Sequence, residues 1–110
     1  MQKYMVTFDL RNAAERDYER VYKWAHENGG YRYFRGTNGV WGRLPSTTVV
    51  VVLRSTSRDG ALTEFKGVLS RMGLDPSHLA LLEGEPAATS EAVSFGLPEY
   101  ANGLYPNYRS

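Results

Sequence analysis

Cysteine is absent from the 110 residues, so the chain has no disulfide, no thiol nucleophile and no cysteine ligand for zinc. Long apolar runs are also absent. The longest aliphatic run, residues 49–53, is far shorter than the ~20 residues of a membrane-spanning helix. The N-terminus shows no apolar stretch behind a basic start, as a secretion signal would have. We therefore expect a cytoplasmic protein that does not enter a membrane.

A large excess of charge is missing too, since the formal net charge is +1. A chain that coats nucleic acid non-specifically needs a strong positive charge, so any site for a polyanion must be local. Residues 1–60 hold ten Lys and Arg against six Asp and Glu, whereas residues 61–110 hold three against six. Ten of the 13 basic residues are Arg. The guanidinium fork of Arg suits phosphate, although the base composition of the gene would produce the same excess.

What is present suffices for one small domain. Hydrophobic residues make up 42% and charged residues 23% of the chain, which is ordinary for a globular protein and too apolar for a disordered one. We expect a single domain over residues 1–85 and a tail containing Pro and Tyr over residues 86–110. The aromatic residues of the tail predict that it packs on the domain or on a partner subunit, with a mobile tail as the alternative.

Hydrophobic periodicity predicts six elements in the domain. Alternation of apolar and polar residues predicts strands over residues 4–10 and 31–35, and short apolar runs predict two more over residues 47–54 and 78–83. A turn at residues 36–39 and a loop through Trp41 and Pro45 separate the second strand from the third. Helical spacing predicts helices over residues 18–25 and 57–72, the second capped by Ser57 and ended by Gly73. The order is that of a ferredoxin-like α+β fold, a β-α-β-β-α-β sandwich in which an antiparallel sheet carries both helices on one face.

Two of the predicted strands are apolar on both faces. Valine and leucine occupy every position of residues 49–53, and residues 79–82 contain only Leu and Ala. In a two-layer fold, the sheet face that points away from the helices meets water and should be polar. Something must therefore cover this second face, and we expect a twofold homodimer that packs sheet against sheet, with the tail as the competing cover.

Asp9 is the candidate site residue that this arrangement singles out. It ends an otherwise apolar strand and shares a face with Met5 and Thr7, opposite the face expected under the helices. On a twofold axis two Asp9 side chains would approach each other, and two carboxylates hold a divalent cation that one does not. Mg²⁺ or Mn²⁺ held there would polarise a phosphodiester and activate water. Alternatively, Asp9 caps the first helix or binds the amides of the next loop.

The other candidates for chemistry are basic and aromatic. Arg32, Arg35 and Arg43 alternate with aromatic residues over residues 31–43, a composition that suits stacking on single-stranded bases. The same residues would also arise if the aromatic rings fill the core and the arginines solvate its edge. His26 and His78 stand apart from paired carboxylates in the sequence, which argues against zinc and favours a structural or surface role.

Three segments resemble a known family. Residues 4–10, Tyr-Met-Val-Thr-Phe-Asp-Leu, resemble the first strand of the CRISPR-associated endoribonuclease family Cas-two and of its SinR-like and VapD-like relatives, where an apolar strand ends in Asp followed by Leu or Ile. Residues 17–21, Asp-Tyr-Glu-Arg-Val, resemble the helix start of the SinR-like branch. Residues 45–50, Pro-Ser-Thr-Thr-Val-Val, resemble the start of its third strand. The resemblance extends over residues 1–85.

The resemblance implies a homodimeric, metal-dependent endonuclease. Asp9 of both subunits would be the metal ligand and a catalytic residue, with Mg²⁺ or Mn²⁺ as the cofactor. Ser46 matches a polar residue near that site and is the second catalytic candidate. Family nucleases follow the Asp with a basic run, whereas here Arg11 and Arg16 stand alone, separated by four other residues.

Nucleic acid is the expected partner of this dimer. The candidate contacts to RNA or DNA are five arginines, Arg11, Arg16, Arg32, Arg35 and Arg43. Some relatives of this kind are structural dimers that hold DNA, so the fold alone implies no reaction. The alternative is a non-catalytic dimer that binds nucleic acid, or a protein partner through the tail.

Overall fold

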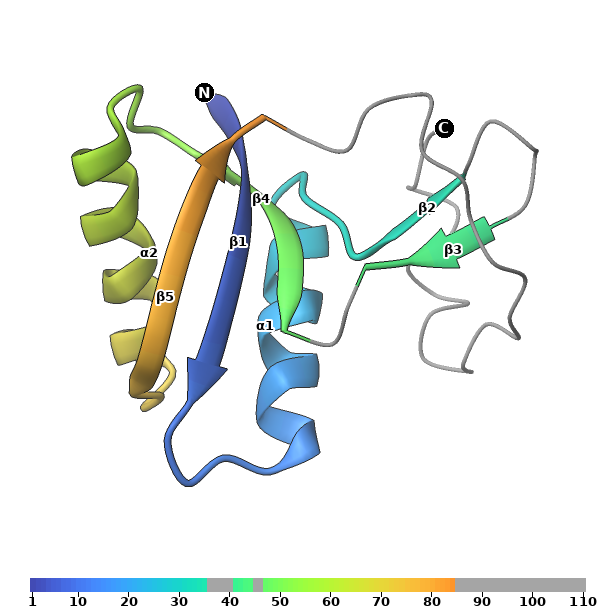
Figure 1. Cartoon of the computed structure of the whole chain (residues 1–110), viewed down its shortest axis with the longest axis vertical. Helices are drawn as coiled ribbons and strands as arrows, with labels where there is room; N and C mark the ends of the chain where they lie inside the picture. Colours follow the sequence, from blue (N-terminus) through green and yellow to red (C-terminus); the bar gives the residue numbers. More distant parts are fainter. Residues whose placement is uncertain (36–40, 45–46, 85–110) are drawn as a thin grey trace.

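A three-stranded antiparallel sheet and two helices form an α+β fold (Figure 1). The computed structural model describes residues 1–35, 41–44 and 47–84. Its elements are β1 (Gln2–Leu10), α1 (Glu15–Glu27), β2 (Tyr33–Arg35), β3 (Trp41–Arg43), β4 (Thr48–Leu53), α2 (Arg58–Arg71) and β5 (Pro76–Glu83). The predicted turn at residues 36–39 and the predicted tail over residues 86–110 lie outside the described residues.

Strand β1 is central in the sheet, with β4 on one side and β5 on the other, both antiparallel to it. The register sets Met5 opposite Val50 of β4 and opposite Leu82 of β5. Figure 1 shows α1 beside β4 and α2 along the β5 side of the sheet. The predicted order of strands and helices is compatible with this arrangement.

The core lies between the sheet and the helices. Tyr4, Val6 and Phe8 of β1 are at most 1% exposed, and they alternate with Met5 and Thr7, which are partly or fully exposed. This is the period of two expected for a strand with one buried face. Other core residues are Val21 and Ala25 of α1, Val49, Val51 and Leu53 of β4, and Ala61, Phe65 and Leu69 of α2. Burying each of the larger side chains contributes about 1.5–3 kcal/mol.

Local signals fix both helices. The Ser57 hydroxyl accepts a hydrogen bond from the Gly60 amide at 3.1 Å, and Gly73, just past the end of α2, has a φ of +75°. Both features confirm the prediction for this helix. At the start of α1, the Asp17 carboxylate accepts a hydrogen bond from the Ala14 amide at 2.9 Å. None of the helices in the described part of the chain is long and apolar enough to span a bilayer.

The segment after α1 differs from its prediction. Tyr31 bridges Val50 through two backbone hydrogen bonds of 2.8 Å. The chain then leaves the main sheet, so the predicted strand over residues 31–35 is only three residues long and starts at Tyr33. It pairs with β3 in a two-stranded hairpin, and the predicted loop through Trp41 was wrong because Trp41–Arg43 is a strand.

Arg32 anchors the chain at the point where it leaves the main sheet. Its side chain is 7% exposed, and its guanidinium lies 4.2 Å from the centre of the Tyr22 ring of α1. The Arg32 carbonyl accepts a hydrogen bond from the Leu44 amide at 2.8 Å. Arg32 is thus held by α1 through its side chain and by the residue after β3 through its carbonyl, and these two contacts direct β2 toward β3. The spacing of apolar residues in the sequence does not predict this pairing.

Candidate functional site

Asp9 lies at the end of β1 on the outer face of the sheet, the face that points away from the helices. Its neighbours Phe8 and Leu10 are buried in the core, whereas 58% of the Asp9 side chain is exposed. The predicted orientation of Asp9, opposite the core residues of its strand, is therefore the one observed. Its backbone carbonyl accepts a hydrogen bond from the Ser77 hydroxyl at 3.3 Å.

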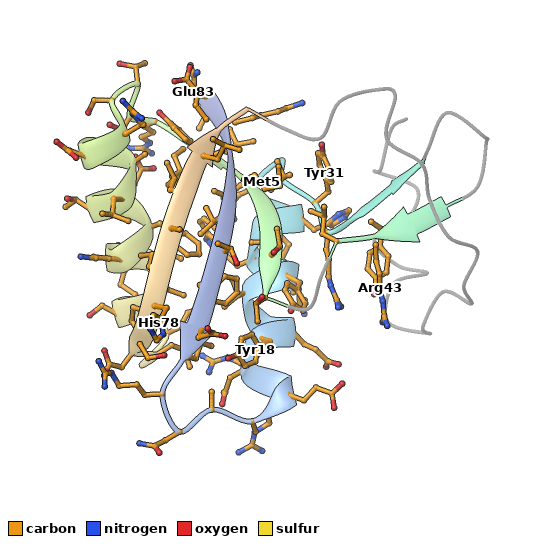
Figure 2. The ribbon with its side chains drawn as sticks, viewed as in Figure 1. Met5, Tyr18, Tyr31, Arg43, His78 and Glu83 are labelled. Carbon is orange, nitrogen blue, oxygen red and sulfur yellow. The ribbon has the colours of Figure 1, made fainter. Side chains whose placement is uncertain are left out.

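His78 lies directly opposite Asp9 on the neighbouring strand β5. The imidazole Nδ1 is 3.9 Å from the Asp9 Oδ2, and the histidine side chain is 83% exposed. Figure 2 shows His78 at the end of the sheet where β1 terminates. The sequence placed His78 at the start of a strand but gave it no carboxylate partner, because the register between strands so far apart in the chain was not known.

Among the described residues, Asp9 does not take the alternative role of capping α1. Asp17 makes the hydrogen bond to the amide at the start of this helix. Within the described part of the chain, the Asp9 carboxylate interacts with His78 and with no loop amide. Its position at the end of an apolar strand thus has no explanation in helix capping.

Two of the predicted phosphate contacts lie at the same end of the sheet. Arg11 follows β1, and its Nε is 3.2 Å from the Asp75 Oδ2, with both side chains more than half exposed. An exposed pair of this kind contributes little to stability, about 0–1 kcal/mol, so a phosphate can compete for the guanidinium. Arg16 is exposed in the first turn of α1. Both positions fit a role in flanking the Asp9 carboxylate.

An apolar strip adjoins Asp9 and His78 on the outer face. It consists of Met5, Ala80 and Leu82 and lies beside Val50 of β4. Val50 is fully buried, Met5 is partly buried, Ala80 is exposed and Leu82 is 65% exposed. The expectation that β4 is buried on both faces is thus met at Val50, whereas the outer face of β5 is open in a single chain. Covering this strip would remove apolar surface from water.

The remaining predicted arginines lie away from Asp9. Arg43 is exposed on β3, and Figure 2 shows it on the hairpin, far across the molecule from His78. Arg32 faces the rings of Tyr22 and Tyr33, at 4.2 and 5.7 Å from their centres. A contact between Arg32 and nucleic acid would require this cluster to open. Arg35 pairs with Trp41 in the hairpin, and Ser46 lies outside the described residues.

The described part of one chain offers too few ligands for a metal centre. Within the described residues, no group of three or more His, Cys, Asp or Glu side chains is placed to hold an ion. At the end of β1 a single chain supplies one carboxylate and one imidazole. A divalent cation at Asp9 would therefore need ligands from a second copy of the chain as well as water.

Comparisons of the chain with protein-family models, with curated proteins and with solved structures found no significant match. The family resemblance of residues 1–85 stays a prediction. What defines the chain is its α+β sheet, with a carboxylate and an imidazole paired on an outer face that is partly apolar.

Proposed function

We propose that the chain is a cytoplasmic homodimer with a ferredoxin-like fold that acts on nucleic acid, as a Mg²⁺-dependent endonuclease of the Cas-two and SinR-like kind. The observation that carries the proposal is the placement of Asp9. It stands exposed on the outer face, at the end of an apolar strip that a second copy of the chain would cover.

The strip supplies the reason for dimerisation. Met5 and Leu82 lie opposite each other in adjacent strands, and Leu82 keeps 65% of its surface exposed in one chain. Burying an exposed leucine side chain stabilises a complex by about 1.5–3 kcal/mol. In a twofold interface each chain buries its own Leu82, so this contribution occurs twice. A twofold axis near the Asp9 end of this strip brings the two Asp9 carboxylates toward each other.

The donor set suits a hard or borderline divalent cation. Two carboxylates provide the oxygen ligands that Mg²⁺ prefers, and the two His78 imidazoles would add nitrogen ligands that Mn²⁺ accepts more readily. The bound ion would supply Lewis acidity toward the phosphodiester. Arg11 and Arg16, at the same end of the sheet, would hold flanking phosphates and so orient the strand.

Cleavage assays test this function directly. Wild type and Asp9→Asn are incubated with labelled single-stranded RNA and duplex DNA in Mg²⁺, Mn²⁺ or EDTA. Asp59→Asn, at an exposed position in the first turn of α2, is the matched control. We expect cleavage by wild type and by the control, and its loss in Asp9→Asn and in EDTA. Cleavage that persists in Asp9→Asn would contradict the assigned role.

A non-catalytic dimer is the second candidate, and one observation favours it. The Asp9 carboxylate of each chain has the His78 imidazole 3.9 Å away, and no group of three metal-ligating side chains is present among the described residues. Such a dimer would bind nucleic acid without metal and tolerate Asp9→Asn. If it captures a protein partner through its tail, deletion of residues 87–110 should abolish capture and leave the fold intact.

A further inference from the structure

A groove of about 520 Å³ lies between α1, α2 and the end of β4, and Asp9 is not among the residues that line it. Leu53, at the end of β4, pairs with Gln2 at the start of β1. The groove therefore adjoins the start of β1, whereas Asp9 is near the end of that strand. Its lining includes Trp24 of α1, Val52 of β4, Arg54 just after β4, and Glu64, Val68 and Arg71 of α2. Its volume is within the range of about 300–1,000 Å³ that is usual for small-molecule sites.

Positive charge predominates in this groove. Arg54 and Arg71 are exposed, and neither guanidinium has an ion pair or hydrogen bond within the described part of the chain. The only acid that lines the groove, among the described residues, is Glu64, and its carboxylate is already engaged. It accepts hydrogen bonds from the backbone amides of Arg54, at 3.0 and 3.2 Å, and Ser55, at 3.1 Å. Two guanidiniums are thus available to an anion, while the acid beside them is held by the main chain.

An aromatic wall accompanies the two arginines. Trp24 lines the groove and is partly buried, and its ring packs against Phe65 with 6.1 Å between the ring centres. Asn28, the residue that caps the end of α1, donates a hydrogen bond from its side-chain amide to the Trp24 carbonyl at 2.8 Å, which holds this end of the helix. Val52 and Val68 add apolar surface. Because Phe65 packs against the Trp24 indole, the indole offers a flat surface to an aromatic ligand and loses little side-chain entropy on binding.

We propose that this groove binds a nucleoside phosphate, with the base against Trp24 and the phosphate on Arg54 and Arg71. A ligand that is both aromatic and anionic would contact the indole and the two guanidiniums together. A phosphate alone would contact only the guanidiniums, and an uncharged ring only the indole. The site is separate from Asp9 and stands whether or not the chain is a nuclease.

Tryptophan fluorescence reports on this binding directly. The chain has two tryptophans, so Trp41→Phe leaves Trp24 as the only tryptophan, and excitation selective for tryptophan reports on it alone. Titration with AMP should give a saturable change in emission, and adenosine or inorganic phosphate alone should bind at least about tenfold more weakly. Calorimetry on the unsubstituted chain should give the same dissociation constant. The absence of a saturable signal in both measurements up to about 10 mM AMP would overturn the proposal.

Arginine variants locate the phosphate. Arg54→Gln and Arg71→Gln should each weaken AMP binding at least about tenfold. Arg71→Lys keeps a positive charge in the last turn of α2, where it favours the helix dipole, but loses the guanidinium fork, and should also weaken binding. Arg58→Gln, at an exposed position in the first turn of the same helix, is the control and should bind as wild type does. Equal affinity in Arg54→Gln, Arg71→Gln and wild type would overturn the assignment.

Discussion

Gly30 shows at the scale of one residue how the sheet and α1 are joined. A Cβ at this position would lie 2.1 Å from the Val50 carbonyl oxygen and 3.0 Å from the Val51 Cα, both backbone atoms that cannot rotate away. The close approach permits the two hydrogen bonds between Tyr31 and Val50 at the edge of β4. The absence of a side chain here therefore sets where the chain leaves α1 and meets the sheet.

Gly30→Ala should destabilise the fold by about 1–3 kcal/mol, since the backbone must shift to relieve the overlap. Gly67→Ala is the matched control, because the nearest atom to its new Cβ is the end of the Arg71 side chain at 3.5 Å. Inside α2 this change should instead stabilise by about 0.5–1 kcal/mol. Urea unfolding measures both, and equal effects of the two substitutions would refute the close-approach argument.

Tyr4 gives a prediction for alkaline pH. Its hydroxyl donates a hydrogen bond to the Ser55 carbonyl at 2.7 Å. Burial raises the pKa of Tyr4 above its ordinary value of 10.0, and the carboxylates of Glu83 and Glu64 add to the rise. Because the folded state holds this proton more tightly, the associated stability is complete below pH 10.0 and is lost as the pH rises through the raised pKa.

Tyr4→Phe should therefore lose less stability than wild type when the pH is raised from about 9 to about 11. At neutral pH the substitution should cost about 0.5–1.5 kcal/mol, the net value of the hydrogen bond. Denaturant unfolding at a series of pH values measures the difference between the two proteins. If the difference in unfolding free energy between the two proteins stays constant across the alkaline range, folding does not raise the pKa of Tyr4.

At the scale of the element, α2 depends on its first turn. The Ser57 hydroxyl accepts from the Gly60 amide, and Ser57→Ala removes this cap. We expect a loss of about 1 kcal/mol in the free energy of unfolding. Ser70→Ala, an exposed change near the end of the same helix, should have an effect within about 0.5 kcal/mol of zero. Thermal unfolding of the two variants side by side tests the cap.

Elements with local signals could be predicted from the sequence, and elements that depend on distant partners could not. Alternation in β1 and the Ser57 cap are written in neighbouring residues, so both followed from the sequence. The hairpin of β2 and β3 was missed because alternation identifies a strand but not its partner, and because the contact of Arg32 with Tyr22 has no periodic signature.

In the candidate site, too, only the features that depend on neighbouring residues could be predicted from the sequence. The outward direction of Asp9 followed from its place in the strand. Its pairing with His78 depends on the register between β1 and β5, which is irregular at Asp9 and Leu10 and is set by packing along both strands. The groove at Trp24 brings together residues of three elements, so its arginines carried no signal in the sequence.

At the scale of the whole molecule, the outer face should decide the oligomeric state. Leu82→Lys places a charge in the apolar strip at a side chain already 65% exposed. We expect a wild-type dimer and a Leu82→Lys monomer by sedimentation velocity. The exposed substitution Thr63→Lys in α2 is the control and should remain dimeric. A dimer that survives Leu82→Lys unchanged would exclude this strip as the interface.

The central claim is that two copies of the chain share one divalent cation between their Asp9 carboxylates. The most direct measurement is calorimetric titration of the purified protein with Mn²⁺, in wild type and in Asp9→Asn. A shared site predicts one ion for every two chains, and no binding in the variant. One ion per chain, binding that survives Asp9→Asn, or no binding to wild type would contradict it.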